Sequence, residues 1–102
     1  MTEITISEEV TEIEKYAFTD CSKLKSITIP KKCRKIHEKS FHCCSKLEIV
    51  NFECEKIEID EHAFSFCTEL RNLKLNNTII TVHPYAFTEC PKLDLSKIPI
   101  TN

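Results

Sequence analysis

The chain has 102 residues, 41% of them hydrophobic, which suits one compact domain with a core of its own. Its 14 basic and 16 acidic residues leave a net charge of −2, which excludes the basic surface typical of nucleic-acid binding and a polybasic membrane anchor. The absence of glycine excludes the glycine-rich loops that cradle phosphates and dinucleotides.

The N-terminus has neither the basic start nor the apolar run of a secretory signal. No apolar run elsewhere is long enough to span a bilayer. We therefore expect no membrane insertion and, as the sequence stands, a cytoplasmic protein. A cell-surface location is the alternative if the sequence is a fragment of a longer exported chain.

A unit of 23 residues recurs four times and reads I-x-x-x-A-F-x-x-C-x-x-L-x-x-I-x-I-P. Its columns keep their spacing without insertion or deletion. They include Ile13, Ile36, Ile59 and Val82; Phe18, Phe41, Phe64 and Phe87; Cys21, Cys44, Cys67 and Cys90; and Leu24, Leu47, Leu70 and Leu93. Such strict phase predicts a repeat solenoid, in which stacked units share one core.

After each leucine of the repeat, apolar and polar residues alternate, which predicts a strand with one buried face. We expect parallel strands over 3–6, 26–29, 49–52 and 72–75, and a ragged fifth over 95–98. The A-F-x-x-C segments predict short helical or 3-10 turns on the opposite wall. The whole chain, 1–102, is then a single solenoid domain, with units at about 8–30, 31–53, 54–76 and 77–99 after a partial strand 1–7.

Residues 17–30, AFTDCSKLKSITIP, resemble the repeat of BspA-like leucine-rich proteins, and the similarity extends to about residue 99. The resemblance implies a right-handed solenoid without catalytic residues. It also implies a frequent role in adhesion or host interaction at the surface of bacteria and anaerobic protists. The family usually has glycine directly after the core isoleucine, so we expect left-handed backbone there. This chain carries Glu14, His37, Asp60 and His83 at that place.

The cysteine column shares its phase with the core, so we interpret these four residues as buried thiols. Disulfides between neighbouring coils are the alternative, although stacked Cβ atoms about 5 Å apart lie beyond the usual bridge. Cys33 falls in a core column. Cys43 and Cys54 fall in connecting segments, where we expect exposed thiols open to oxidation.

Two groupings contain metal-ligand types: His42-Cys43-Cys44, and the vertical file His37, Asp60 and His83. Cys44 points into the predicted core, and the outer histidines of the file would lie about 10 Å apart, so neither grouping converges on one zinc ion. A weak His37–Asp60 pair stays open. No motif sets a nucleophile beside a base, so we expect no enzyme and no cofactor.

The outward strand positions form the candidate partner-binding face, which comprises Ser26, Thr28, Ile49, Asn51, Asn72 and Lys74. A charged file of Lys25, Glu48, Arg71 and Asp94 flanks it. Repeat solenoids bind proteins on such faces, so we hypothesise a protein-binding scaffold whose partner is unknown. Ile49 is either a binding hot spot or a tolerated surface residue. Because the predicted end caps are weak, end-to-end self-association is the alternative.

Overall fold

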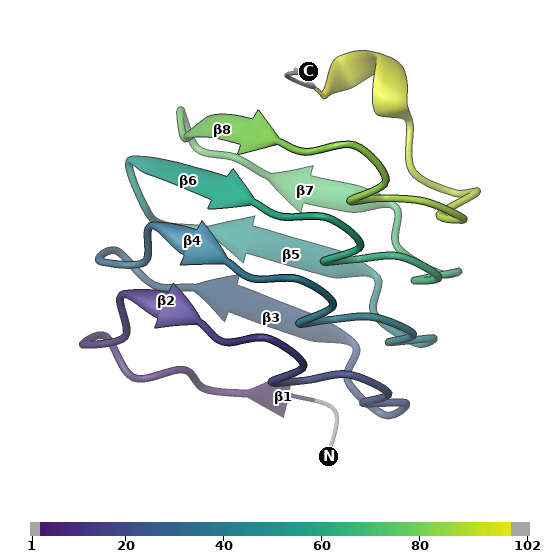
Figure 1. Ribbon diagram of the computed structural model, residues 1–102, viewed down its shortest axis with the longest axis horizontal. Coiled ribbons are helices and arrows are strands. Elements are labelled where there is room, and N and C mark those ends of the chain that lie inside the picture. The colour runs from purple at the N-terminus through teal and green to yellow at the C-terminus, as the bar shows by residue number, and fades with distance from the viewer. Residues whose placement is uncertain (1–2, 99–102) are drawn as a thin grey trace.

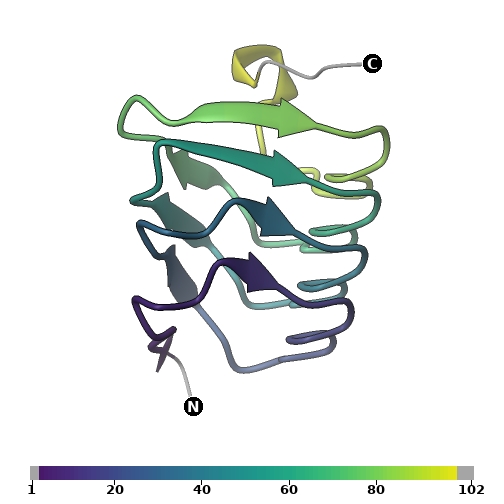
Figure 2. The ribbon, with the colours of Figure 1, turned by 60° about the vertical axis from the view of Figure 1, so that its left-hand side comes forward.

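A computed structural model describes residues 3–98, which form two parallel four-stranded sheets (Figure 1). Sheet A has the order β1-β3-β5-β7, with bounds Glu3–Ile4, Ser26–Ile29, Ile49–Phe52 and Asn72–Lys74. Sheet B has the order β2-β4-β6-β8, with bounds Glu12–Ile13, Lys35–Ile36, Lys56–Ile59 and Ile79–Val82. Figure 2 shows the sheets as opposite walls of a stack of coils. The predicted repeat solenoid with a parallel sheet is confirmed.

Register in both sheets follows the repeat length. Ser26 pairs with Ile49 and Ile49 pairs with Asn72, each 23 residues further on, and β6 pairs with β8 at the same offset. A fixed offset places like residues directly above one another, so the columns of the sequence become vertical files. We call the stacked units 8–30, 31–53, 54–76 and 77–98 the first to fourth coils.

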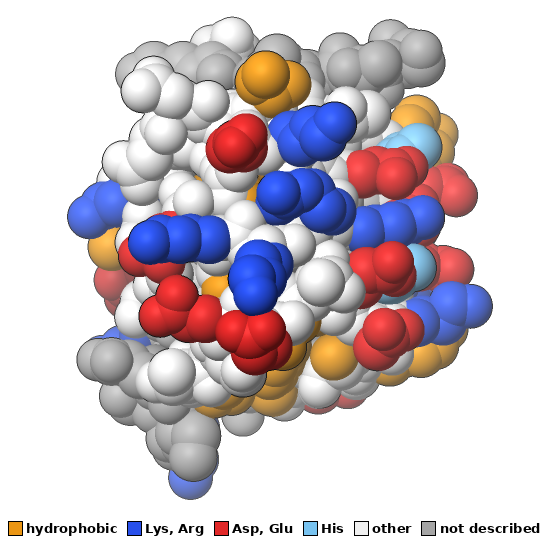
Figure 3. All heavy atoms as spheres, turned by 90° about the vertical axis from the view of Figure 1, so that its left-hand side faces the viewer, with side chains coloured by type: hydrophobic (Ala, Val, Ile, Leu, Met, Phe, Trp, Pro, Cys, Tyr) orange, Lys and Arg blue, Asp and Glu red, His pale blue; other side chains and the backbone are white. Residues whose placement is uncertain are grey.

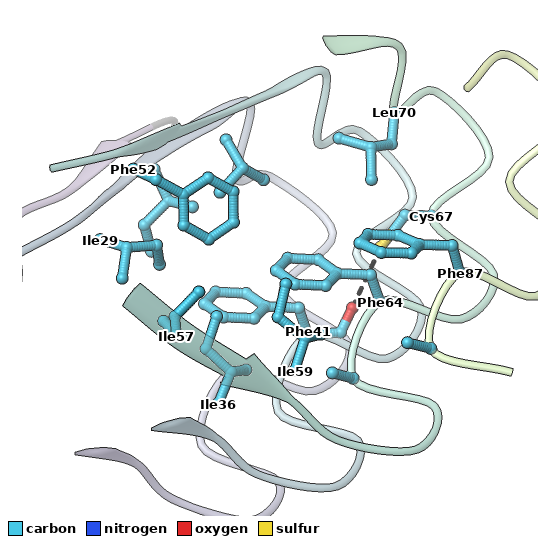
Figure 4. Close-up of a cluster of buried hydrophobic side chains, with 14 of the residues drawn as sticks. Ile29, Ile36, Phe41, Phe52, Ile57, Ile59, Phe64, Cys67, Leu70 and Phe87 are labelled. Atoms are coloured by element: carbon cyan, nitrogen blue, oxygen red, sulfur yellow. Dashed lines mark hydrogen bonds between the residues drawn. The ribbon is translucent and has the colours of Figure 1, made fainter. Parts of the chain in front are cut away.

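The phenylalanine column forms a continuous stack at the centre of the core (Figure 4). Ring centroids lie 5.2 Å apart for Phe18–Phe41, 4.9 Å for Phe41–Phe64 and 5.4 Å for Phe64–Phe87. The last three rings are buried, and Phe18 is partly buried because no described coil lies below it. The layered rings pack together with the buried leucine, isoleucine and cysteine columns, so apolar burial holds neighbouring coils together.

The A-F-x-x-C segments, which follow sheet B in each coil, do not form the helical turns predicted for them. Each segment is a run of tight turns, closed in the first coil by amides of Ala17, Thr19 and Cys21 that donate to carbonyls three residues earlier. Sheet B precedes these turns and was not predicted. Its signal is the alternation of Lys56, Ile57, Glu58 and Ile59, which is clear only in the third unit.

Left-handed backbone recurs twice in the A-F-x-x-C turns of every coil, and again at Asn76 and Asn77, although the chain has no glycine. The positive-φ residues of the A-F-x-x-C turns are Tyr16, Asp20, Lys39, Cys43, His62, Phe66, Tyr85 and Glu89, with φ between 56° and 65°. The expectation that Glu14, His37, Asp60 and His83 hold this geometry is wrong by two positions. The reason is that the third residue of each four-residue turn takes positive φ, as in a type II turn.

Replacing Glu89 by glycine is expected to stabilise the protein by about 1 kcal/mol relative to Glu89→Ala. Both variants remove the same exposed side chain, but only glycine escapes the clash of Cβ with the backbone at φ 59°. Urea unfolding of the two variants measures the difference. Equal urea midpoints would show that a Cβ atom at this positive φ does not lower the stability of the protein.

The C-terminal end departs from the predicted fifth strand over 95–98. Leu95–Lys97 form a 3-10 helix, η1, because Asp94 accepts hydrogen bonds from the Ser96 amide at 3.1 Å and from its hydroxyl at 2.6 Å. Such local bonds compete with strand pairing. Ile98 still enters the core, with 9% of its surface exposed. Pro99, assigned to the final unit, lies outside the described residues. No helix within residues 3–98 is long and apolar enough to cross a membrane.

Candidate functional site

The six residues of the predicted binding face lie together on the outer side of sheet A. Register places Ser26, Ile49 and Asn72 in one file and Thr28, Asn51 and Lys74 in the next. Thr28, Asn72 and Lys74 are exposed, whereas the other three are partly buried. Adjacent strands are about 4.8 Å apart, so each file spans about 10 Å across three rigid strands.

Ile49 occupies the middle of its file, and a hydrogen-bonded pair of amides lies beside it. Asn76 Nδ2 donates to Asn51 Oδ1 at 3.0 Å and to the Phe52 carbonyl at 3.2 Å. These bonds fix the Asn51 side chain and leave its own amide protons available for a partner. Asn76 was missed because its role depends on the left-handed turn after β7, where its φ is 48°.

The flanking file of Lys25, Glu48, Arg71 and Asp94 follows the same stacking. The Glu48 amide donates to the Lys25 carbonyl at 2.8 Å, and the Arg71 amide donates to the Glu48 carbonyl at 3.0 Å. Charge alternates in sign along the file, so it offers a partner a pattern of charge and not a single strong field.

Removing the Lys92 charge is expected to raise the pKa of Glu69, next to this file. The Lys92 ammonium donates to Glu69 Oε1 at 2.8 Å and lowers the pKa of that carboxyl, with smaller help from Arg71. Because the pKa of Glu69 is lower in the folded state, the carboxylate stabilises the fold at pH values above its pKa in the unfolded chain. This stabilisation is lost as the pH falls through the pKa of the folded state. Lys92→Met should shift the Glu69 titration upward by NMR, and Lys46→Met, in the same column, should shift it less. An unchanged titration in Lys92→Met would contradict the pairing.

A second charged surface follows sheet B, where Figure 3 shows acidic, basic and histidine side chains gathered along one side of the view. His37 Nε2 lies 2.5 Å from Glu12 Oε1, and His83 Nε2 lies 2.5 Å from Glu58 Oε2. Lys35 lies in the column of Glu12 and Glu58, and its ammonium approaches Glu58 Oε1 at 3.8 Å. Each of these pairs joins neighbouring coils. The sequence reading missed Glu12 and Glu58 because it expected no strand in this wall.

The predicted file of His37, Asp60 and His83 does stack in one column. Asp60 contacts Lys35 at 4.0 Å, and the histidines contact glutamates instead of each other. Within residues 3–98, no three or more histidine, cysteine or acidic side chains are grouped so that they could hold a metal ion. The file therefore links neighbouring coils through one Lys–Asp ion pair and two histidine–glutamate contacts at hydrogen-bond distance.

The cysteine column lies in the core, as predicted for Cys44, Cys67 and Cys90. Each of these thiols donates to the phenylalanine carbonyl of the coil below, at 3.2 Å to Phe18, 3.2 Å to Phe41 and 3.1 Å to Phe64. Figure 4 shows the bond from Cys67. The two neighbouring thiols and burial raise the pKa of Cys67. All seven cysteines of the chain are free thiols.

The remaining cysteines were placed partly correctly. Cys33 is buried, as its core column predicts, and Cys43 is partly buried in a left-handed turn. The exposed position expected for Cys54 is wrong, because its side chain is 3% exposed. Thr78 Oγ1 donates to its carbonyl at 2.6 Å, which draws the connection between β5 and β6 inward.

A serine–histidine pair also occurs, although no sequence motif points to it. His42 Nδ1 lies 2.6 Å from Ser65 Oγ, and that hydroxyl contacts the His62 carbonyl at 3.2 Å. Ser65 is completely buried, so a substrate has no access to its hydroxyl. The pair links two turns of the wall and provides no accessible nucleophile.

The repeated strand, turn and core columns define a leucine-rich repeat solenoid. The family model for the BspA type leucine rich repeat region matches residues 1–102 in six copies, so the chain belongs to that family and the resemblance is confirmed. Proteins of this family generally serve protein interaction or structure and are typically non-enzymatic.

A crystal structure of a leucine-rich repeat protein from Bacteroides ovatus is similar at 23% sequence identity, with a TM-score of 0.46. The match covers 89% of this chain and 38% of the Bacteroides chain, so this chain spans well under half the length of that protein. No curated protein matches the chain.

Proposed function

We propose that the protein is a non-catalytic interaction scaffold that binds a protein partner through the outer face of sheet A. The observation that carries this proposal is the gathering of the six face residues, from three strands, around one apolar side chain, Ile49. The family's general role in protein interaction supports it.

The chemistry of this face suits a folded protein more than a small ligand. Ile49 is surrounded by hydroxyl and amide groups from neighbouring strands, which resembles a hot spot enclosed by a polar rim. Strand backbones hold these groups in place before binding, so little conformational entropy is lost when a partner docks. The alternating charges of the flanking file would set the partner's register.

Alanine at Ile49, Asn51, Asn72 and Lys74 together is expected to weaken partner binding at least about tenfold, equivalent to about 1.4 kcal/mol. The partner is first identified by cross-linking in the native cell and is then titrated, purified, against wild type and variant. The matched control carries alanine at four outward positions of sheet B: Glu12, Lys56, Ile79 and Thr81. Unchanged affinity in the sheet A variant, with circular dichroism showing an intact fold, would refute the proposed face.

The structural alternative is a self-associating unit or a part of a larger surface adhesion protein. It is favoured by the N-terminal end of the described stack, where Ile4, Ile6 and Val10 are only partly buried. Apolar columns that are closed in the middle coils are open at this end of the described stack.

A further inference from the structure

Every junction between coils in the turn wall uses backbone hydrogen bonds of one polarity. Amides of the first coil donate upward to carbonyls of the second, and the second donates to the third in the same way. The three bonds of the first junction are Tyr16 to Glu38 at 3.3 Å, Phe18 to Ser40 at 2.7 Å, and Asp20 to His42 at 2.8 Å. The lower coil is always the donor.

The two ends of the stack therefore carry complementary groups. In the fourth coil, the amides of Tyr85, Phe87 and Glu89 have no acceptor among the described residues. In the first coil, the carbonyls of Lys15, Ala17 and Thr19 likewise have no donor within residues 3–98. The repeat positions of Ala17 and Thr19 accept at all three inner junctions, and the position of Lys15 accepts at the first two.

The first coil also presents an apolar end. Ala17 is exposed, whereas Ala63 and Ala86 of the same column are 0% and 1% exposed. Phe18 and Cys21 are partly buried, and their equivalents in the upper coils are fully buried. In the upper coils, this burial comes from the coil below, and no coil among the described residues covers the same face of the first coil.

We propose that a second copy of this chain docks head-to-tail, with its first coil on the turn wall and sheet B of the fourth coil. The Phe18 ring of the second copy then continues the stack above Phe87. Its Ala17 lies directly above Ala86, in the same column of the repeat. This inference deepens the structural alternative above and does not depend on the sheet A face.

Hydrogen-bond polarity favours this arrangement over a two-fold dimer. Two first coils packed face to face would oppose carbonyls to carbonyls and leave both sets unsatisfied in an interface, at a cost of about 1–3 kcal/mol for each group. Head-to-tail docking pairs all three amides with carbonyls. It also brings Glu14 of the second copy above His83, continuing the column Glu14, His37, Asp60 and His83 with an acid beside a histidine. Such contacts are heterologous, so association is open-ended.

The C-terminal segment, residues 95–98, controls access to the upper end of the fourth coil. Leu95 lies four repeat lengths after Glu3, so Leu95–Ile98 and strand β1 of a second copy require the same place beside β7. The Asp94 cap holds this segment as η1. Docking therefore displaces η1, and Asp94→Ala, which removes the cap, strengthens association.

Sedimentation velocity over a concentration series tests the proposal with wild type, Ala17→Arg and the matched control Thr68→Arg. Both positions are exposed in the turn wall, but only Ala17 faces the first coil's open end. Wild type and Thr68→Arg should form species that keep growing with concentration, and Ala17→Arg should weaken association at least about tenfold with an unchanged melting temperature. A strictly monomeric wild type, a closed dimer, or an Ala17→Arg variant that associates like wild type would overturn it. The sheet A alanine variant should associate normally, which separates this test from the partner-binding test.

Discussion

Replacing Phe64 by alanine is expected to lower the free energy of unfolding by about 3–5 kcal/mol. The ring is completely buried and stacks on Phe41 at 4.9 Å and on Phe87 at 5.4 Å. Its removal opens a cavity between two rings that neighbouring coils hold at a fixed spacing, so the site cannot collapse. Urea denaturation at equilibrium measures the loss through the midpoint and slope.

Position in the stack supplies the matched control. Phe18 belongs to the same column but is partly buried and has one ring neighbour, at 5.2 Å. We expect Phe18→Ala to cost about half as much, since less apolar surface and fewer contacts are lost. Equal losses for the two variants would show that the stack does not carry the stability assigned to it.

Cys44 is expected to react with a thiol reagent about a thousandfold or more slowly than its sequence neighbour Cys43 under native conditions. Cys43 is partly buried at the surface of its turn, whereas Cys44 is completely buried and donates its thiol hydrogen to the Phe18 carbonyl. A reagent reaches Cys44 only when the coils separate, so its rate reports the opening free energy. Labelling followed by mass spectrometry measures both rates.

Two controls define this experiment. In concentrated urea, all seven thiols should react at similar rates, because the fold no longer shields any of them. A Cys43→Ser variant should lose one fast-reacting thiol, and Cys44→Ser should lose one slow-reacting thiol. Comparable native rates for Cys43 and Cys44 would contradict the burial of the cysteine column.

Sheet A could be predicted from the sequence because two independent patterns agree there. The strict repeat fixes the register, and the alternation of Ile27 and Ile29 with polar residues fixes which side is buried. Sheet B gave a weaker signal, since β2 and β4 contain only two residues each. A two-residue strand is too short for periodicity to distinguish it from a turn, and the following left-handed turns contain no glycine that would mark them.

The candidate site was predictable where its residues lie on the strands of sheet A, and not where they lie in irregular segments. The outward positions of sheet A follow from strand alternation, so all six residues were placed on one surface. Partners that reach across coils from irregular segments were not predictable, as Asn76 and Glu12 show, because their contacts depend on turn geometry. Cys54 was misplaced for the same reason, since nothing in the sequence shows that its connection folds inward.

The constant repeat length has a consequence for how this protein folds. Every junction joins residues 23 apart, so the chain entropy lost in closing one junction is the same as for any other. The order of assembly is then decided by burial. The second and third coils share the closest ring pair, Phe41 and Phe64, and both rings are fully enclosed. Folding should therefore nucleate in the middle of the stack and spread outward, with the two outer coils ordering last and fraying first.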